Sequence, residues 1–95
     1  MARQDTVGTH KTTIEHGIIN TSVKYHNTEV VRFNQKQIVL NNGGFETNTT
    51  KTRMNQASNQ FVLGFKVFQK DFTWYCLFNG STLEFNDNGT LTLDR

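Results

Sequence analysis

The chain has 95 residues and a net charge of +2, and 35% of its residues are hydrophobic. This length supports one domain that folds without metal or disulfide staples, and it excludes a second core. The charge is too small to indicate a nucleic-acid-binding protein by itself, and the single cysteine excludes an internal disulfide. No charged-then-apolar leader and no long apolar run occurs, so we expect a cytosolic protein that does not contact a membrane.

The composition favours strands over helices. Asn contributes 11 residues and Thr 14, and both types favour turns or strands. Aromatic residues make up 12% of the chain, including eight Phe, so a few large side chains supply much of the core. We expect a mostly β chain with its core concentrated between Phe61 and Phe85.

The first half of the chain predicts an arm followed by a meander of short strands. Residues 1–17 are polar and lack periodicity, which predicts a flexible or extended N-terminal arm before a single domain over residues 18–95. Alternation around Val23 and Tyr25 predicts the first strand of that domain. Two more strands are expected at residues 30–33 and 38–40, before an Asn- and Gly-rich loop at residues 41–44.

A helix is predicted over residues 48–60. Asn48, Thr49 or Thr50 is the expected N-cap, and Gly64 is placed suitably to end the helix one turn after Phe61. On a helical wheel the side expected to face the core differs sharply from the polar side. The core side carries Met54, Ala57, Ser58 and Phe61, and the polar side carries Thr52, Asn55, Gln56, Asn59 and Gln60, flanked by Lys51 and Arg53.

Strands return after the helix. Phe65 and Val67 mark one strand, residues 72–78 a second and residues 82–85 a third, with Asn79-Gly80 as the strongest hairpin signal. Leu91 and Leu93 indicate a last strand. The strand at residues 72–78 is apolar on both faces, which predicts a central position covered by the helix on one face and by another layer or a partner on the other. We therefore predict a small single-domain α+β fold, with antiparallel β-hairpins or a meander flanking one helix in the order β-β-β-α-β-β-β.

The polar side of the predicted helix is the main candidate for function. It carries amides and cations but no carboxylate, whereas a helix surface in water usually mixes both charges. Amides can bond base edges, a helix N-terminus can bind phosphate, and Arg53 would be the main anchor for an anion. The alternative interpretation is a polar face that is simply solvated.

A second candidate is the strand that follows the helix. If Phe65 and Val67 point inward, alternation sends Lys66 and Phe68 outward, as either an exposed aromatic site for stacking a base or an oligomer contact. The complete predicted ligand site comprises Lys51, Thr52, Arg53, Asn55, Gln56, Asn59, Lys66 and Phe68.

Catalytic and metal-binding patterns are weak. His10, His16 and His26 lack the spacing of metal ligands, and they are interpreted as ordinary surface residues. Cys76 lies in the most apolar strand, which predicts a core thiol rather than a nucleophile. The acids are isolated along the chain. We therefore expect no enzyme activity, no catalytic residues, no metal and no cofactor.

One segment resembles a known family. It is the run Thr50-Lys51-Thr52-Arg53-Met54-Asn55-Gln56-Ala57-Ser58-Asn59-Gln60-Phe61, followed by Leu63-Gly64-Phe65 and by Val67-Phe68-Gln69-Lys70-Asp71-Phe72-x-Trp74. This segment resembles a family of short, uncharacterised proteins of tailed phages and some bacteria, and the similarity covers about residues 25 to 85. The resemblance implies a phage accessory protein in the cytoplasm of a bacterial host, and it transfers no functional residue.

The sequence predicts a small non-enzymatic accessory protein that binds a nucleic acid or a phosphorylated nucleotide through the polar, cationic helix. The first alternative is a protein-interaction module, acting on a host factor or as a homodimer. In that case the strand containing Trp74, or the hairpin over residues 65–78, is buried against the partner. A small enzyme is the second alternative, and the missing acid/base constellation argues against it.

Overall fold

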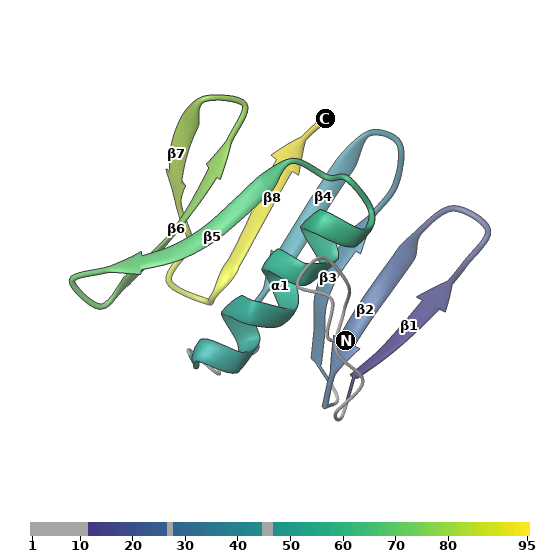
Figure 1. Ribbon diagram of the computed structural model, residues 1–95, viewed down its shortest axis with the longest axis horizontal. Helices are drawn as coiled ribbons and strands as arrows, with labels where there is room; N and C mark the ends of the chain where they lie inside the picture. The colour runs from purple at the N-terminus through teal and green to yellow at the C-terminus, as the bar shows by residue number, and fades with distance from the viewer. Residues whose placement is uncertain (1–11, 27, 45–46) are drawn as a thin grey trace, which may run out of the picture.

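The computed structural model describes residues 12–26, 28–44 and 47–95. Over these residues the chain forms strands and a single helix (Figure 1). The elements are β1 (Thr12–His16), β2 (Thr21–Tyr25), β3 (Thr28–Phe33), β4 (Gln37–Asn41), α1 (Asn48–Gln60), β5 (Phe65–Lys70), β6 (Thr73–Phe78), β7 (Ser81–Glu84) and β8 (Thr90–Asp94).

The strands form two antiparallel sheets. One has the order β1-β2-β3-β4-β8, and the other has the order β5-β6-β7. Strands account for 52% of the described residues and the helix for 16%, so the predicted α+β fold class is wrong and the protein is mostly β. The prediction is wrong because a single helix was taken to define the fold class, although the Asn- and Thr-rich composition favours strands.

The predicted order β-β-β-α-β-β-β has one strand too few on each side of the helix, although the last strand predicted at Leu91 and Leu93 is confirmed as β8. Residues 12–16, assigned to the N-terminal arm, form β1 and pair with β2 along their length. Residues 1–11 of that arm lie outside the described residues. After the helix four strands follow, and the last, β8, pairs with β4 rather than with its neighbour in sequence, β7. The Asn79-Gly80 turn between β6 and β7 is confirmed, with positive φ at both residues.

The helix has the predicted limits but a different N-cap. Thr47, one residue before the predicted candidates, is extended, and its side-chain oxygen accepts a hydrogen bond from the Thr50 N–H at 3.2 Å. At the other end, the Phe61 N–H donates to the Ala57 carbonyl oxygen. Val62 and Gly64 then take positive φ values, which turn the chain sharply into β5.

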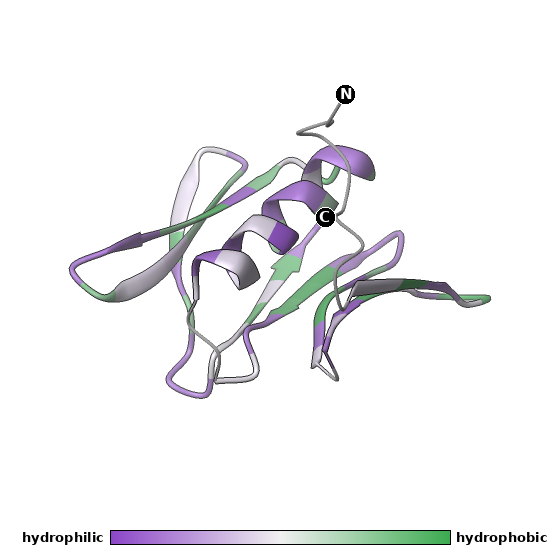
Figure 2. Ribbon diagram, turned by 60° about the horizontal axis from the view of Figure 1, so that its bottom comes forward, coloured by the Kyte–Doolittle hydropathy of each residue, from purple (hydrophilic) through white to green (hydrophobic). Residues whose placement is uncertain are grey.

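The fold has two layers. The helix lies over the five-stranded sheet and beside β5, so that α1 and the three-stranded sheet together cover one face of the larger sheet (Figures 1 and 2). Apolar side chains from both layers meet between them in one cluster. This core includes Val23, Val31, Ile38, Leu40 and Leu93 from the larger sheet, Met54 and Ala57 from α1, and Phe65, Val67, Trp74 and Cys76 from the smaller sheet.

Two helix side chains pair with the edge of β5. Ser58 Oγ donates to the Phe65 carbonyl oxygen at 2.7 Å and accepts from the Phe65 N–H at 3.0 Å. Asn55 does the same at Val67, with Nδ2 donating to the carbonyl oxygen at 3.0 Å and Oδ1 accepting from the N–H at 2.7 Å. Because none of the described strands pairs with β5 on this side, α1 takes the place of one and leaves these backbone groups paired.

We predict that Ser58→Ala destabilises the fold far more than Asn59→Ala. The first change leaves the buried N–H and carbonyl of Phe65 without their partner, which costs roughly 2–4 kcal/mol. Asn59 is exposed on the same helix, and its replacement should change the free energy of unfolding by less than about 0.5 kcal/mol. Urea unfolding followed by circular dichroism measures both values, and equal values would show that the Ser58 pairing does not stabilise the edge of β5.

Candidate functional site

The structure separates the two cations of the predicted helix site. Lys51 extends toward the smaller sheet, where Nζ lies 3.1 Å from Gln69 Oε1 and 5.7 Å from the Trp74 ring centre. Arg53 extends toward the larger sheet, and its Nε donates to Thr12 Oγ1 at 2.9 Å. The same guanidinium contacts the Gln56 amide oxygen at 3.1 Å and lies 5.7 Å from the Tyr25 ring. These cations bridge α1 to the two sheets and do not form one anion-binding surface.

The polar residues of the predicted helix site also divide. Asn55 is half-buried, and both the nitrogen and the oxygen of its side-chain amide are hydrogen-bonded to the Val67 backbone. Gln56 is half-buried beside Arg53, while Thr52 and Asn59 are exposed. The helix therefore presents an uncharged polar stripe to solvent, with its cations and one amide already engaged in packing.

The outer face of the smaller sheet brings the other two predicted residues together. Phe65 and Val67 are buried, so the predicted alternation of β5 is confirmed, and Lys66 is exposed on the opposite face. Phe68 is half-buried on that face, directly across from Tyr75 of β6. The two rings are stacked, with their centres 5.6 Å apart and their planes at 23°.

Further residues complete this surface, which we call the β5–β7 platform. It comprises Lys66, Phe68 and Lys70 of β5 together with Tyr75 and Leu77 of β6. Leu77 pairs with Lys66 and is 41% exposed, which is high for a large apolar side chain. Among the described residues the ion pairs are Lys24–Glu15 and Arg32–Glu29, and neither involves a lysine of the platform. On β7, Glu84 pairs with Tyr75 and places a carboxylate at the edge of the platform away from β5.

The eight residues of the predicted ligand site do not include Tyr75, Leu77 or Lys70. The strand at residues 72–78 is predicted to be apolar on both faces, and alternation places Tyr75 and Leu77 on the face opposite the buried Trp74, Cys76 and Phe78. The strand is central in its sheet, as predicted. Trp74 itself is 2% exposed and packs edge-on against Phe85, so it belongs to the core rather than to a surface that a partner would cover.

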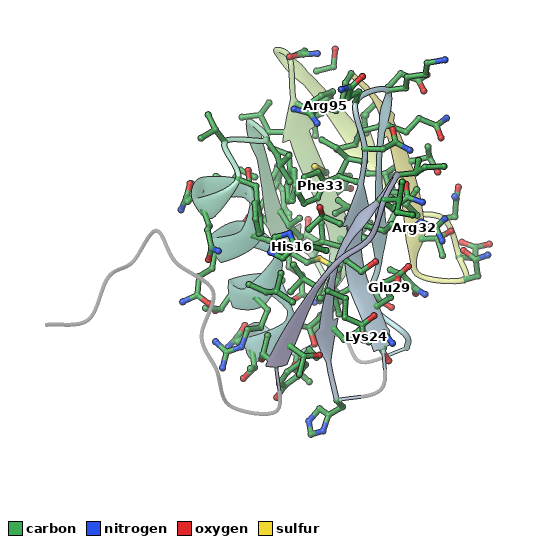
Figure 3. All side chains as sticks on the ribbon, turned by 90° about the vertical axis from the view of Figure 1, so that its right-hand side faces the viewer. His16, Lys24, Glu29, Arg32, Phe33 and Arg95 are labelled. Atoms are coloured by element: carbon green, nitrogen blue, oxygen red, sulfur yellow. The ribbon has the colours of Figure 1, made fainter. Side chains whose placement is uncertain are left out.

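The outer face of the larger sheet has a different character. Lys24, Glu29 and Arg32 lie on the side of that sheet away from α1 (Figure 3). Lys24 is 3.4 Å from Glu15, and Arg32 is 3.4 Å from Glu29. These exposed pairs neutralise one another, so this face carries no excess of one charge.

A separate apolar feature lies at the turn between β1 and β2. Ile18 and Ile19 are both exposed, and the turn is closed by a 2.8 Å bond from the Gly17 N–H to the Asn20 carbonyl oxygen. The Asn34 amide donates to Asn20 Oδ1 at 2.9 Å and ties the turn to the loop between β3 and β4. An open hollow of about 420 Å³ lies between the two loops, lined by Ile18, Ile19, Asn34, Gln35 and Lys36.

The titratable residues considered for catalysis occupy ordinary positions. His16 is exposed and contacts the edge of Phe61, and His26 packs against Tyr25. His10 lies outside the described residues, within which no group of three or more His, Cys, Asp or Glu is placed to hold a metal. Cys76 is fully buried, as predicted, and desolvation raises the pKa of its thiol to about 11, partly offset by a backbone hydrogen bond from Lys66.

Comparison with known proteins now identifies the family. A family model for the Kyanoviridae Gp96 protein matches residues 1–92. The chain belongs to the Kyanoviridae Gp96 protein family. The predicted resemblance to a phage protein family is confirmed at that level, and the match extends beyond the residues on which the resemblance was based.

Other comparisons are negative. Searches of the curated proteins and of the solved structures give no significant match. Within the part of the chain that the structure describes, no helix has the length and apolar character needed to span a membrane.

We predict that Cys76 stays unreactive toward thiol reagents in the folded protein at pH 8 and reacts fully in urea. Its raised pKa means that the folded state holds the thiol proton more tightly than the unfolded state, whose value is near 9.0. The associated stability is present below about pH 9 and is lost as the pH rises toward 11. Urea unfolding of the wild type and of Cys76→Ala across this range isolates the effect, and parallel pH profiles would contradict it.

Proposed function

We propose that this phage protein is a small, non-enzymatic accessory protein that binds single-stranded nucleic acid across the β5–β7 platform. The observation that carries the proposal is the stacked pair Phe68 and Tyr75, partly open to solvent, on the same face as Lys66 and Lys70. A sheet surface that combines stacked rings with neighbouring cations has the chemistry used to bind unpaired bases.

The arrangement assigns different parts of the ligand to different strands. Bases would lie on the Phe68 and Tyr75 rings, and Leu77 would extend the apolar surface. Phosphates would follow β5, where Lys66 and Lys70 lie on the same side of the strand, about 14 Å apart along four residues. Glu84 on the opposite margin disfavours a phosphate path along β7.

The predicted site on the helix becomes secondary in this proposal. Lys51, Arg53 and Asn55 already contact the two sheets, and binding an anion there would require breaking contacts that hold α1 in place. A phosphorylated nucleotide remains compatible with the platform, since one base on Phe68 and one phosphate near Lys66 would use the same chemistry.

We predict that the protein binds a fluorescein-labelled oligothymidylate with an affinity that falls as salt increases. Lys66→Ala with Lys70→Ala should weaken binding and lower the slope of log affinity against log salt by about 1.4, since each phosphate contact with a single strand contributes about 0.7. Phe68→Ala should weaken binding roughly 5- to 150-fold through lost stacking. Fluorescence anisotropy measures each effect.

Lys24→Ala is the matched control. Lys24 is also a strand lysine, but it lies on the outer face of the other sheet beside Glu15. This variant should bind like the wild type. If the platform double variant also binds like the wild type, or if binding is insensitive to salt, the platform is not the nucleic-acid site.

Self-association is a second candidate function, and a separate observation favours it. Ile18 is fully exposed and Ile19 is 76% exposed, although β-branched apolar residues are unusual at the centre of a turn. They border the hollow beside Asn34, Gln35 and Lys36. In a two-fold dimer, each copy would place its isoleucines against the hollow of the other.

We predict that, if this surface is an interface, Ile18→Ser with Ile19→Ser converts a dimer into a monomer. Both side chains are exposed in the single chain, so the double change should leave the free energy of unfolding of the monomer nearly unaltered. Sedimentation velocity over a range of concentrations measures the mass. A monomeric wild type at high concentration would remove this candidate and would leave the nucleic-acid proposal untouched.

A further inference from the structure

The turn between β5 and β6 holds a bulky residue in a conformation that favours glycine. Asp71 and Phe72 have φ values of 51° and 67°, so both central residues of this two-residue hairpin turn are left-handed. The turn between β6 and β7 has the same signs of φ but uses Asn79 and Gly80. Phenylalanine at such a position is strained, because its Cβ crowds the backbone.

The Phe72 ring is also left in water. It is 91% exposed, whereas every other Phe, Tyr and Trp that the structure describes is at least partly buried. Its ring takes part in no ring contact among the described residues. Packing therefore does not compensate for the backbone strain. A residue that is unfavourable for both backbone and solvation, in a sheet whose other turn uses Asn-Gly, indicates a role outside the fold itself.

We propose that Phe72 is a third stacking residue, which holds an unpaired base beyond the end of the β5–β7 platform. This inference rests on the proposed function and specifies the length and path of the ligand. Tyr75, which faces Phe68, is three residues from Phe72, about 10 Å along the strand. At about 3.4 Å for each stacked base, the ring at the tip is roughly three bases away from the Phe68–Tyr75 pair, beyond the reach of a trinucleotide that starts on that pair.

The charges around the turn agree with a base rather than a phosphate at the tip. Lys70 immediately precedes the turn and can hold the last phosphate that follows β5. Asp71 is exposed next to Phe72, and its carboxylate would repel a phosphate placed there. The ligand backbone would therefore end its contact at Lys70, while the next base reaches the Phe72 ring.

The test compares a short oligothymidylate of about three nucleotides with a longer one of about ten. The wild type should bind the longer one more tightly, and Phe72→Leu should lose roughly fivefold or more of affinity for the longer one only. Leucine keeps the bulk and the backbone strain but removes the flat ring. Phe72→Trp should still bind the longer oligothymidylate more tightly than the shorter one, because tryptophan keeps an aromatic face at this position.

A second measurement separates binding from folding. Phe72→Gly should raise the melting temperature by roughly 2–8 °C as the strain is relieved, and yet bind the longer oligonucleotide as weakly as Phe72→Leu. Val62 is also exposed with a positive φ, but it lies after the helix and outside the platform. Val62→Gly should therefore gain stability without losing affinity.

The outcomes distinguish the two proposals. If Phe72→Leu matches the wild type on both oligonucleotides while the platform variants bind weakly, the role of Phe72 is wrong and the platform proposal stands. If the wild type binds neither oligonucleotide, both proposals fail.

Discussion

The pairing of Ser58 and Asn55 with the free edge of β5 is the interaction on which the rest of the structure depends. Each side chain satisfies both the N–H and the carbonyl of one β5 residue. A three-stranded sheet would otherwise expose this edge to other chains. By occupying it, α1 joins the smaller sheet as one layer, and this combined layer is wide enough to cover the five-stranded sheet and enclose the core.

This arrangement also determines which surfaces remain for binding. The inner face of the smaller sheet is occupied by Trp74, Cys76 and Phe78, and its β5 edge is occupied by the helix. The helix cations are drawn to opposite sides, Lys51 toward β5 and Arg53 toward β1 and β2. Among the described residues, the outer face of the smaller sheet stays open, with aromatic rings and lysines close together, and so does the turn that carries Phe72.

The two hairpin turns of the smaller sheet illustrate how stability and proposed function separate. Asn79-Gly80 fits its left-handed conformation and needs no other explanation. Asp71-Phe72 adopts a similar conformation with a strained, exposed ring. Because Asn-Gly forms the other hairpin turn of the same sheet, the hairpin geometry does not require a phenylalanine at position 72. Membership of a phage protein family is compatible with a small binding protein, but the proposal itself rests on these side chains.

The sequence by itself determined the local structure: the limits of the helix, its buried side, the alternation of β5 and the Asn-Gly turn all follow from spacings of two to four residues. Only the tertiary structure decided that β8 pairs with β4, that Thr12–His16 forms an edge strand, and that Asn55 bonds the backbone of Val67 instead of facing a ligand. Those outcomes depend on contacts between residues far apart in the chain. A polar residue on a helical wheel carries no information about whether an unpaired strand edge or water lies opposite it.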